Sequence, residues 1–301
     1  MENLFILTGP TGIGKSNLSL EIAGIFNGEI ISCDSMQIYR QMDIGTAKID
    51  IKSTNIPHHL IDIINPDEKF SVSDYQKICK NMISEINKKN KLPILVGGTG
   101  LYINSIVYNL SFQEVSSNLE FRKELSKKIE EEGLSKYYNI LIEKDFTAKS
   151  IDPNNKNRII RALEILNFSS NRETQNFREK NTDYNLLYIC LNMDRQKLYE
   201  KINDRVDIMI EDGLIEEVSN ILKIYGENLQ SLKAIGYKEI ISYLKGNLSR
   251  EEAIDLIKKN SRNYAKRQLT WFRRDDRIIW LDREDKDLKN KIYKLIKDKY
   301  D

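Results

Sequence analysis

The stretch Phe5-Ile6-Leu7-Thr8-Gly9-Pro10-Thr11-Gly12-Ile13-Gly14-Lys15-Ser16 joins a short apolar run to a glycine-rich turn. Its last eight residues match the pattern G-x-x-x-x-G-K-S, and the apolar spacing after them, from Leu18 to Phe26, is typical of a helix. A strand, a glycine turn and a helix in this order form a phosphate-binding loop, because backbone N–H groups and the helix N-terminus converge on one anion. The stretch predicts a phosphorylated ligand without saying which one.

The residues of this loop have separate expected roles. Lys15 supplies a full positive charge, and the hydroxyl of Ser16 is placed to hold Mg²⁺, which we therefore expect as the cofactor. Nucleotides such as ATP are also expected to bind, because the loop recognises phosphates through its backbone. The rest of the cradle consists of Gly9, Pro10, Thr11, Gly12, Ile13 and Gly14.

Further strand and helix patterns predict an α/β fold. Residues 29–32 are expected to form a second strand and residues 93–96 a continuous apolar strand, and apolar residues recur at helical spacing between positions 75 and 86. Strands separated by helices imply a parallel sheet with helices on both faces.

The composition of the sequence and its pattern of apolar residues change near residue 112. Residues 113–185 are polar and helical, and apolar strand signal returns only at 186–191. We therefore predict a P-loop core made of residues 1–112 and 186–301, with a helical insertion at 113–185 and a helical C-terminal region. A helical continuation of a single domain is the alternative.

The acid that a hydrolytic P-loop protein places at the end of a neighbouring strand is missing. The strand at 94–96 runs into Gly97-Gly98-Thr99-Gly100, and the acid in a comparable position is Asp34, at the end of the strand at 29–32. Ligands gather at the carboxyl ends of parallel strands, so Asp34 is expected near the loop. It could bind metal, accept a proton from a nucleophile, or simply cap a turn.

Composition sets broad limits. The 301 residues include 47 Lys and Arg against 45 Asp and Glu, so net charge indicates no partner. The three cysteines are far apart, which argues against disulfides and a zinc knuckle. No apolar stretch approaches the roughly 20 residues of a membrane span, and the first residues lack a signal-peptide pattern. We expect a cytoplasmic protein, with a monomer as the default state.

A basic segment lies near the C-terminus. Residues 258–277 contain eight basic and two acidic residues, interleaved with Tyr264, Trp271 and Phe272. Ser249 and Glu252 form a capping box, so a helix is expected to start there and reach about residue 268, leaving basic side chains for solvent or a ligand. The segment is either an RNA-binding surface or a solvated charged face.

Together these motifs resemble the bacterial tRNA dimethylallyltransferase family. The matches run in order along almost the whole chain, and the insertion is the weakest stretch. The matching segments are residues 9–16, 31–39, 42–48, 57–60, 96–102, 157–163, 234–239 and 266–273.

The resemblance implies a P-loop core with an inserted helical domain that grips the tRNA anticodon stem-loop. It implies transfer of a dimethylallyl group from dimethylallyl diphosphate to the exocyclic amine of the adenosine next to the anticodon. By motif position, Asp34 matches the general base, Lys15 the diphosphate-binding lysine, and Arg205 the arginine on the leaving group. Positions that match tRNA contacts are Asp34, Ser35, Met36, Gln37, Thr99, Arg122, Asn157, Arg158, Ile159, Ile160, Arg161, Lys266, Arg267, Arg273 and Arg274.

Three other functions remain open at this point. A nucleotide kinase or NTPase shares the P-loop, and an RNA-binding module with a vestigial loop would bind RNA without turnover. An adenylate isopentenyltransferase would use a free nucleotide, but a mononucleotide needs neither the basic segment nor the helical insertion.

Overall fold

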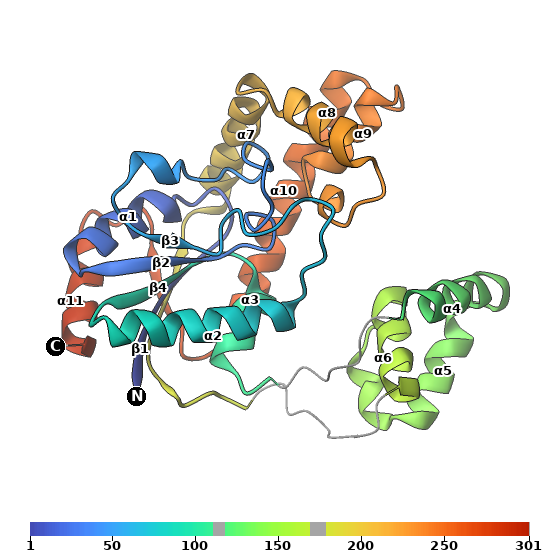
Figure 1. Ribbon diagram of the computed structural model, residues 1–301, viewed down its shortest axis with the longest axis horizontal. Coiled ribbons are helices and arrows are strands. Elements are labelled where there is room, and N and C mark those ends of the chain that lie inside the picture. Colours follow the sequence, from blue (N-terminus) through green and yellow to red (C-terminus); the bar gives the residue numbers. More distant parts are fainter. Residues whose placement is uncertain (111–117, 169–178, 301) are drawn as a thin grey trace. The chain divides into compact units, whose positions relative to one another are not determined.

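The computed structural model describes residues 1–110, 118–168 and 179–300, which form two compact units (Figure 1). The first unit is Met1–Asn109 with Arg178–Asp301, and the second is Leu110–Phe177. The second boundary comes earlier than the predicted one at 185/186. The reason is that Asn181 already belongs to the core, where its backbone N–H donates to the carbonyl of Val107 over 3.0 Å.

The core unit is built on a six-stranded parallel sheet, in the order β3-β2-β4-β1-β5-β6. This confirms the predicted α/β class. Two short strands were not predicted, because two and four residues are too few to show a period. The strands are β1 (Glu2–Thr8), β2 (Gly28–Cys33), β3 (His58–His59), β4 (Leu92–Gly97), β5 (Tyr184–Asn192) and β6 (Ile279–Asp282).

Eight α-helices surround this sheet within the described part of the core. The capping box predicted at Ser249 and Glu252 forms at the start of α10, and Ser71 and Asp74 form another at the start of α2. The helices are α1 (Lys15–Ile25), α2 (Val72–Lys88), α3 (Gly100–Val107), α7 (Arg195–Glu211), α8 (Leu214–Tyr225), α9 (Tyr237–Leu244), α10 (Arg250–Phe272) and α11 (Leu288–Tyr300).

The two faces of the sheet are buried by different helices. Alternate side chains of a strand point to opposite faces, so Phe5 and Leu7 of β1 join one core, which also holds residues of α1, α7 and α11. Helix α2 covers the other face (Figure 1), where the hydroxyl of Tyr75 donates to the carbonyl of Ser32. Burial on both faces explains why the strands read as continuous apolar runs.

A second apolar cluster joins the later helices to the loop after β2. Its buried side chains come from α7, α8, α9 and α10, and the loop contributes Ile38, Tyr39 and Met42. The four helices therefore fix the backbone of this loop beside the P-loop end of the sheet.

The second unit is a small helical bundle made of α4 (Leu119–Glu132), α5 (Leu134–Lys144) and α6 (Lys156–Phe168). Its apolar core surrounds Leu141 and Ile159. The fully buried carboxylate of Glu164 accepts hydrogen bonds from the guanidinium of Arg122 at 2.9 and 2.7 Å, and it also pairs with Arg161.

None of the described helices is long and apolar enough to cross a membrane.

We expect Glu164→Gln to destabilise the helical unit by about 2–4 kcal/mol, because two arginines then lose their counter-charge at a buried position. The measurement is amide hydrogen exchange of α4 and α6, which reports on this unit by itself. Glu124→Gln is the matched control: it breaks a solvent-exposed pair with Lys128 and should leave the exchange unchanged. Equal protection in both variants would contradict the structural role of Glu164.

Candidate active site

The P-loop closes around the ammonium group of Lys15. Gly12 and Gly14 have left-handed backbone angles, with φ of 81° and 82°, so only residues without a side chain follow this path freely. Lys15 Nζ donates to the carbonyls of Gly9 and Pro10, each over 2.9 Å. The loop thus presents a positive charge at the start of α1, as the sequence predicted.

The ends of β2 and β4 form the neighbouring wall. One oxygen of Asp34, Oδ1, accepts the backbone N–H of Met36 over 2.8 Å, so this residue does hold a turn. Its other oxygen, Oδ2, has no hydrogen-bond partner among the described residues. The hydroxyl of Thr99 accepts the backbone N–H of Ser35 over 3.1 Å, which joins the two strand ends. The structure therefore brings together Asp34, Ser35, Met36 and Thr99, as predicted, and leaves one carboxylate oxygen for another group.

Helix α7 brings the guanidinium of Arg205 to the same place. Its Nη1 donates to the hydroxyl of Thr11 over 3.2 Å, and its Nη2 to the carbonyl of Thr46 over 3.5 Å. Burial and the neighbouring Arg205 lower the pKa of Lys15 to about 8, and Asp34 opposes this shift. Burial also lowers the pKa of Arg205, again against the effect of Asp34. Lys15, Arg205 and Asp34 are therefore one electrostatic cluster.

Gln268 is a functional residue that sequence reasoning missed. Its Oε1 accepts the backbone N–H of Thr11 over 2.9 Å, and its Nε2 donates to the carbonyl of Gly98 over 2.9 Å. A Cβ at Gly98 would lie 2.2 Å from Nε2, so only glycine leaves room for this amide. The available signal was position: Gln268 is a polar residue on the buried face of α10, between Ala265 and Phe272.

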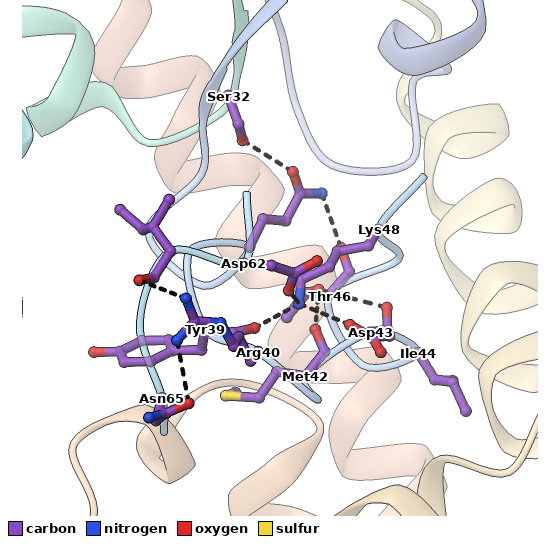
Figure 2. A network of polar contacts seen from close by, with 12 residues as sticks. Ser32, Tyr39, Arg40, Met42, Asp43, Ile44, Thr46, Lys48, Asp62 and Asn65 are labelled. Atoms are coloured by element: carbon purple, nitrogen blue, oxygen red, sulfur yellow. Dashed lines mark hydrogen bonds and ion pairs between the residues drawn. The ribbon is translucent and has the colours of Figure 1, made fainter. Parts of the chain in front are cut away.

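A polar network holds the loop between β2 and β3 (Figure 2). The ammonium group of Lys48 is buried, and it contacts the carboxylates of Asp43 and Asp62 and the carbonyl of Tyr39. Gln37, a predicted tRNA contact, bridges Ser32 and the carbonyl of Thr46. That carbonyl also accepts from Arg205, so the loop positions the arginine.

Glu217 of α8 secures the same loop from the other side. Its carboxylate accepts the backbone N–H groups of Asp43, Ile44 and Gly45 at 2.8, 2.7 and 3.0 Å, and the hydroxyl of Tyr237 at 2.6 Å. Tyr237 lies in the segment at 234–239, so this segment helps Glu217 to hold the loop between β2 and β3. Nothing in the sequence alone joined Glu217 to residues so distant along the chain.

Four exposed cations lie at the C-terminal end of α10: Lys266 and Arg267 are in the helix, and Arg273 and Arg274 follow it. None of the four has an acidic partner among the described residues. Arg267 and Arg274 lie over the rings of Tyr264 and Trp271, at 5.6 and 6.0 Å from the ring centres.

Two basic residues in the first half of this segment are engaged within the core unit. Lys258 pairs with Asp207 over 2.7 Å, and Arg262 donates to Asn203 over 2.6 Å, so both bind α10 to α7.

The predicted tRNA contacts of the helical unit differ in their surroundings. Asn157 and Arg158 are exposed, whereas Arg122 and Arg161 are engaged by Glu164. The side chains of Ile159 and Ile160 are buried in the core of the unit. Their side chains hold α6 in place, and the tRNA contact at these two positions stays a prediction.

The described residues contain no cluster of three or more acidic, histidine or cysteine side chains that could bind a metal ion. The predicted Mg²⁺ would have to be held by the hydroxyl of Ser16 together with ligand phosphates. Ser16 is exposed at the first turn of α1, which suits this role.

Comparison with known proteins identifies the family. The model of the family described as IPP transferase matches residues 37–275. The chain belongs to the IPP transferase family. It is 50% identical over 284 residues to a tRNA dimethylallyltransferase of Alkaliphilus oremlandii, covering 93% of this chain and 91% of the relative. The family predicted from the sequence motifs is thus confirmed.

Solved structures of this family agree with the fold. A full-length tRNA isopentenylpyrophosphate transferase from Bacillus halodurans is 43% identical with a TM-score of 0.75, covering 99% of this chain and 97% of that one. A eukaryotic dimethylallyltransferase solved while acting on tRNA is 29% identical with a TM-score of 0.82, covering 98% of this chain and 78% of that one. The likeness extends over both compact units.

Lys15 gives the site a testable pH dependence. A bound anion favours the protonated lysine, so binding above the pKa of about 8 must take up a proton. We expect the affinity for inorganic diphosphate to fall by up to about tenfold per pH unit above pH 8. Titration calorimetry measures this, with Lys15→Arg as the control, because a guanidinium stays charged and only the ligand titrates. Parallel pH profiles for the two proteins would contradict the assignment.

Proposed function

We propose that the protein transfers a dimethylallyl group from dimethylallyl diphosphate to N6 of the adenosine at position 37 of tRNA, giving N6-isopentenyladenosine and diphosphate. The observation that carries the proposal is the cluster of Lys15, Arg205 and Asp34 at one end of the sheet. Two cations there suit a leaving diphosphate, and one carboxylate suits an amine that must lose a proton.

The chemistry needs no phosphoryl transfer. The bond between C1 of the dimethylallyl group and the diphosphate oxygen breaks, and a bond from N6 to C1 forms. The electron pair of the broken bond leaves with the diphosphate, and the proton of N6 passes to Asp34 Oδ2, which has no other partner among the described residues. Strand β4 ends in Gly97 without an acid, so the usual anchor for a hydrolytic metal is absent from this strand.

Preorganised charge lowers the barrier of this step. Negative charge develops on the diphosphate as the bond breaks, and Lys15 and Arg205 are held beside it before the reaction starts. A bound Mg²⁺, held by Ser16 and diphosphate oxygens, would supply further positive charge to the leaving group.

The acceptor is recognised by two surfaces under this proposal. The cations of α10 with Tyr264 and Trp271 suit the phosphates and bases of an RNA strand, and Asn157 and Arg158 of α6 offer a second contact. The target adenine must leave its stack to reach Asp34. A cytoplasmic location remains a prediction from the sequence.

The decisive experiment offers labelled dimethylallyl diphosphate with bulk tRNA, AMP or ATP as acceptor, and follows phosphate release in parallel. Label in tRNA, recovered as prenylated adenosine after digestion, is the expected result. Label in AMP or ATP would indicate an adenylate isopentenyltransferase. Phosphate release from ATP without prenylated tRNA would place the protein among NTPases.

Asp34→Asn should retain tRNA affinity and lose about 10²–10⁴ in single-turnover rate, because the amide keeps the turn but cannot accept the proton. The rate is measured with saturating tRNA and dimethylallyl diphosphate, and tRNA affinity by filter binding. A near-normal rate would place the base elsewhere, and a loss of tRNA affinity alone would make Asp34 a binding residue.

Replacing Lys266 and Arg267 by Glu should weaken tRNA binding and reduce its salt dependence. Each lost phosphate contact lowers the slope of log affinity against log salt by roughly 0.7–0.9. Lys297→Glu is the control, since it changes an exposed charge on α11. If the double variant and the control bind tRNA equally, this face of α10 is only solvated.

A further inference from the structure

Arg283 is a half-buried arginine beside the P-loop that takes no part in the mechanism above. Among the described residues, Nε of Arg283 is the buried side-chain polar atom that lacks a hydrogen-bond partner. Buried polar groups in native proteins are nearly always paired, and an unpaired one that belongs to a charged group costs more than a neutral one. Such an atom therefore calls for an explanation.

Arg283 is held against the start of α1. It directly follows β6, and its backbone N–H donates to the carbonyl of Asn192 over 2.7 Å, which extends the pairing of β6 with β5. A Cβ built on Gly14 would lie 3.5 Å from Nε and 3.6 Å from Nη2 of Arg283. The guanidinium thus lies against the residue that precedes Lys15 and caps α1.

Two acids that follow Arg283 bind other cations, and Oδ1 of Asp282, which precedes it, accepts the backbone N–H of Glu284 over 2.9 Å. Glu284 binds Lys197 at 2.9 and 3.0 Å, and Asp285 pairs with Lys291. No ion pair to Arg283 exists among the described residues. The guanidinium therefore has no counter-ion within the described chain and is able to bind an anionic ligand.

Sheet order places this cation at the opposite side of the loop from the acceptor. Strand β1 leads into the P-loop, with β4 and β2 on one side of it and β5 and β6 on the other. Asp34 follows β2, and Arg283 follows β6. A diphosphate whose prenyl carbon points to Asp34 would have its terminal phosphate toward the β6 side.

We propose that Arg283 binds the terminal phosphate of the donor diphosphate. The terminal phosphate carries more charge than the bridging one, and a guanidinium can bind two of its oxygens at once. The inference rests on the proposed function for the direction of the donor, while the contact with a second phosphate can be measured without it.

The test compares Arg283→Met and Arg283→Lys in the full chain. Calorimetry with Mg²⁺ should show inorganic diphosphate binding about 10–100-fold more weakly to the Met variant, as for a lost charged hydrogen bond, and to an intermediate degree to the Lys variant. Affinities for inorganic phosphate and for tRNA should change less than about twofold. In the transfer assay KM for dimethylallyl diphosphate should rise with kcat nearly constant, because the contact is made before the reaction and during it alike.

Lys286→Met is the matched control, because it removes an exposed charge from the same loop. Unchanged diphosphate affinity in a folded Arg283→Met variant overturns the inference, and Arg283→Lys serves as that test if the Met variant does not fold. Equal losses for phosphate and diphosphate would also overturn it, since they indicate a general disturbance of the loop. If the wild type transfers the prenyl group to tRNA and the Arg283 variants keep the wild-type affinity for diphosphate, the inference is refuted and the proposed function stands. A diphosphate contact at Arg283 without transfer to tRNA would refute the proposed function alone.

Discussion

The side-chain amide of Gln268 is the contact on which the geometry of the site depends. It binds the backbone of the P-loop at Thr11 and the backbone after β4 at Gly98, and so joins the two loops beyond the point where β1 and β4 pair at Thr8 and Gly97. The same helix carries Lys266 and Arg267, and Arg273 and Arg274 follow its end. One helix therefore sets the shape of the phosphate site and presents the charged face to solvent. A shift of α10 would therefore affect both the phosphate site and the basic residues, because the side chain of Gln268 joins this helix directly to the backbone of Thr11 and Gly98.

A second constraint is electrostatic. Lys15 and Arg205 are both half-buried, and burial together with the charge of Arg205 lowers the pKa of Lys15 to about 8. Asp34 offsets only part of this. The free protein therefore holds an excess of positive charge at the end of its sheet, at a cost in stability that an anionic ligand relieves. The polar loop around Lys48 and Glu217 resists relaxation of this arrangement, because it fixes the carbonyl of Thr46 beneath Arg205.

Much of the fold was predictable from the sequence, and so was part of the site. Long apolar strands, the capping box at Ser249 and the P-loop are local signals, and all of them appear in the structure where expected. Strand β6 is short and half-buried, so Arg283 could not be placed beside Gly14. The contacts of Gln268 and Glu217 join residues more than 150 positions apart, and no local pattern encodes them. The motif at 157–161 did not show that the side chains of Ile159 and Ile160 pack inside the helical unit, because a motif does not distinguish residues that touch a ligand from those that support them.

Pairing is what separates the structural arginines from the ligand-binding ones. In the helical unit, Arg122 and Arg161 both pair with the buried Glu164, and the pair with Arg122 joins α4 to α6. On the core unit, Lys266, Arg267, Arg273 and Arg274 have no acidic partner among the described residues, and Arg283 keeps an unpaired buried nitrogen. Composition cannot reveal this difference in pairing, because the chain as a whole has 47 basic and 45 acidic residues. A cation left unpaired near a loop that binds phosphate lowers the stability of the free protein unless a ligand completes it. The proposed contacts with diphosphate and tRNA therefore rest on where the unpaired cations lie and not on their number.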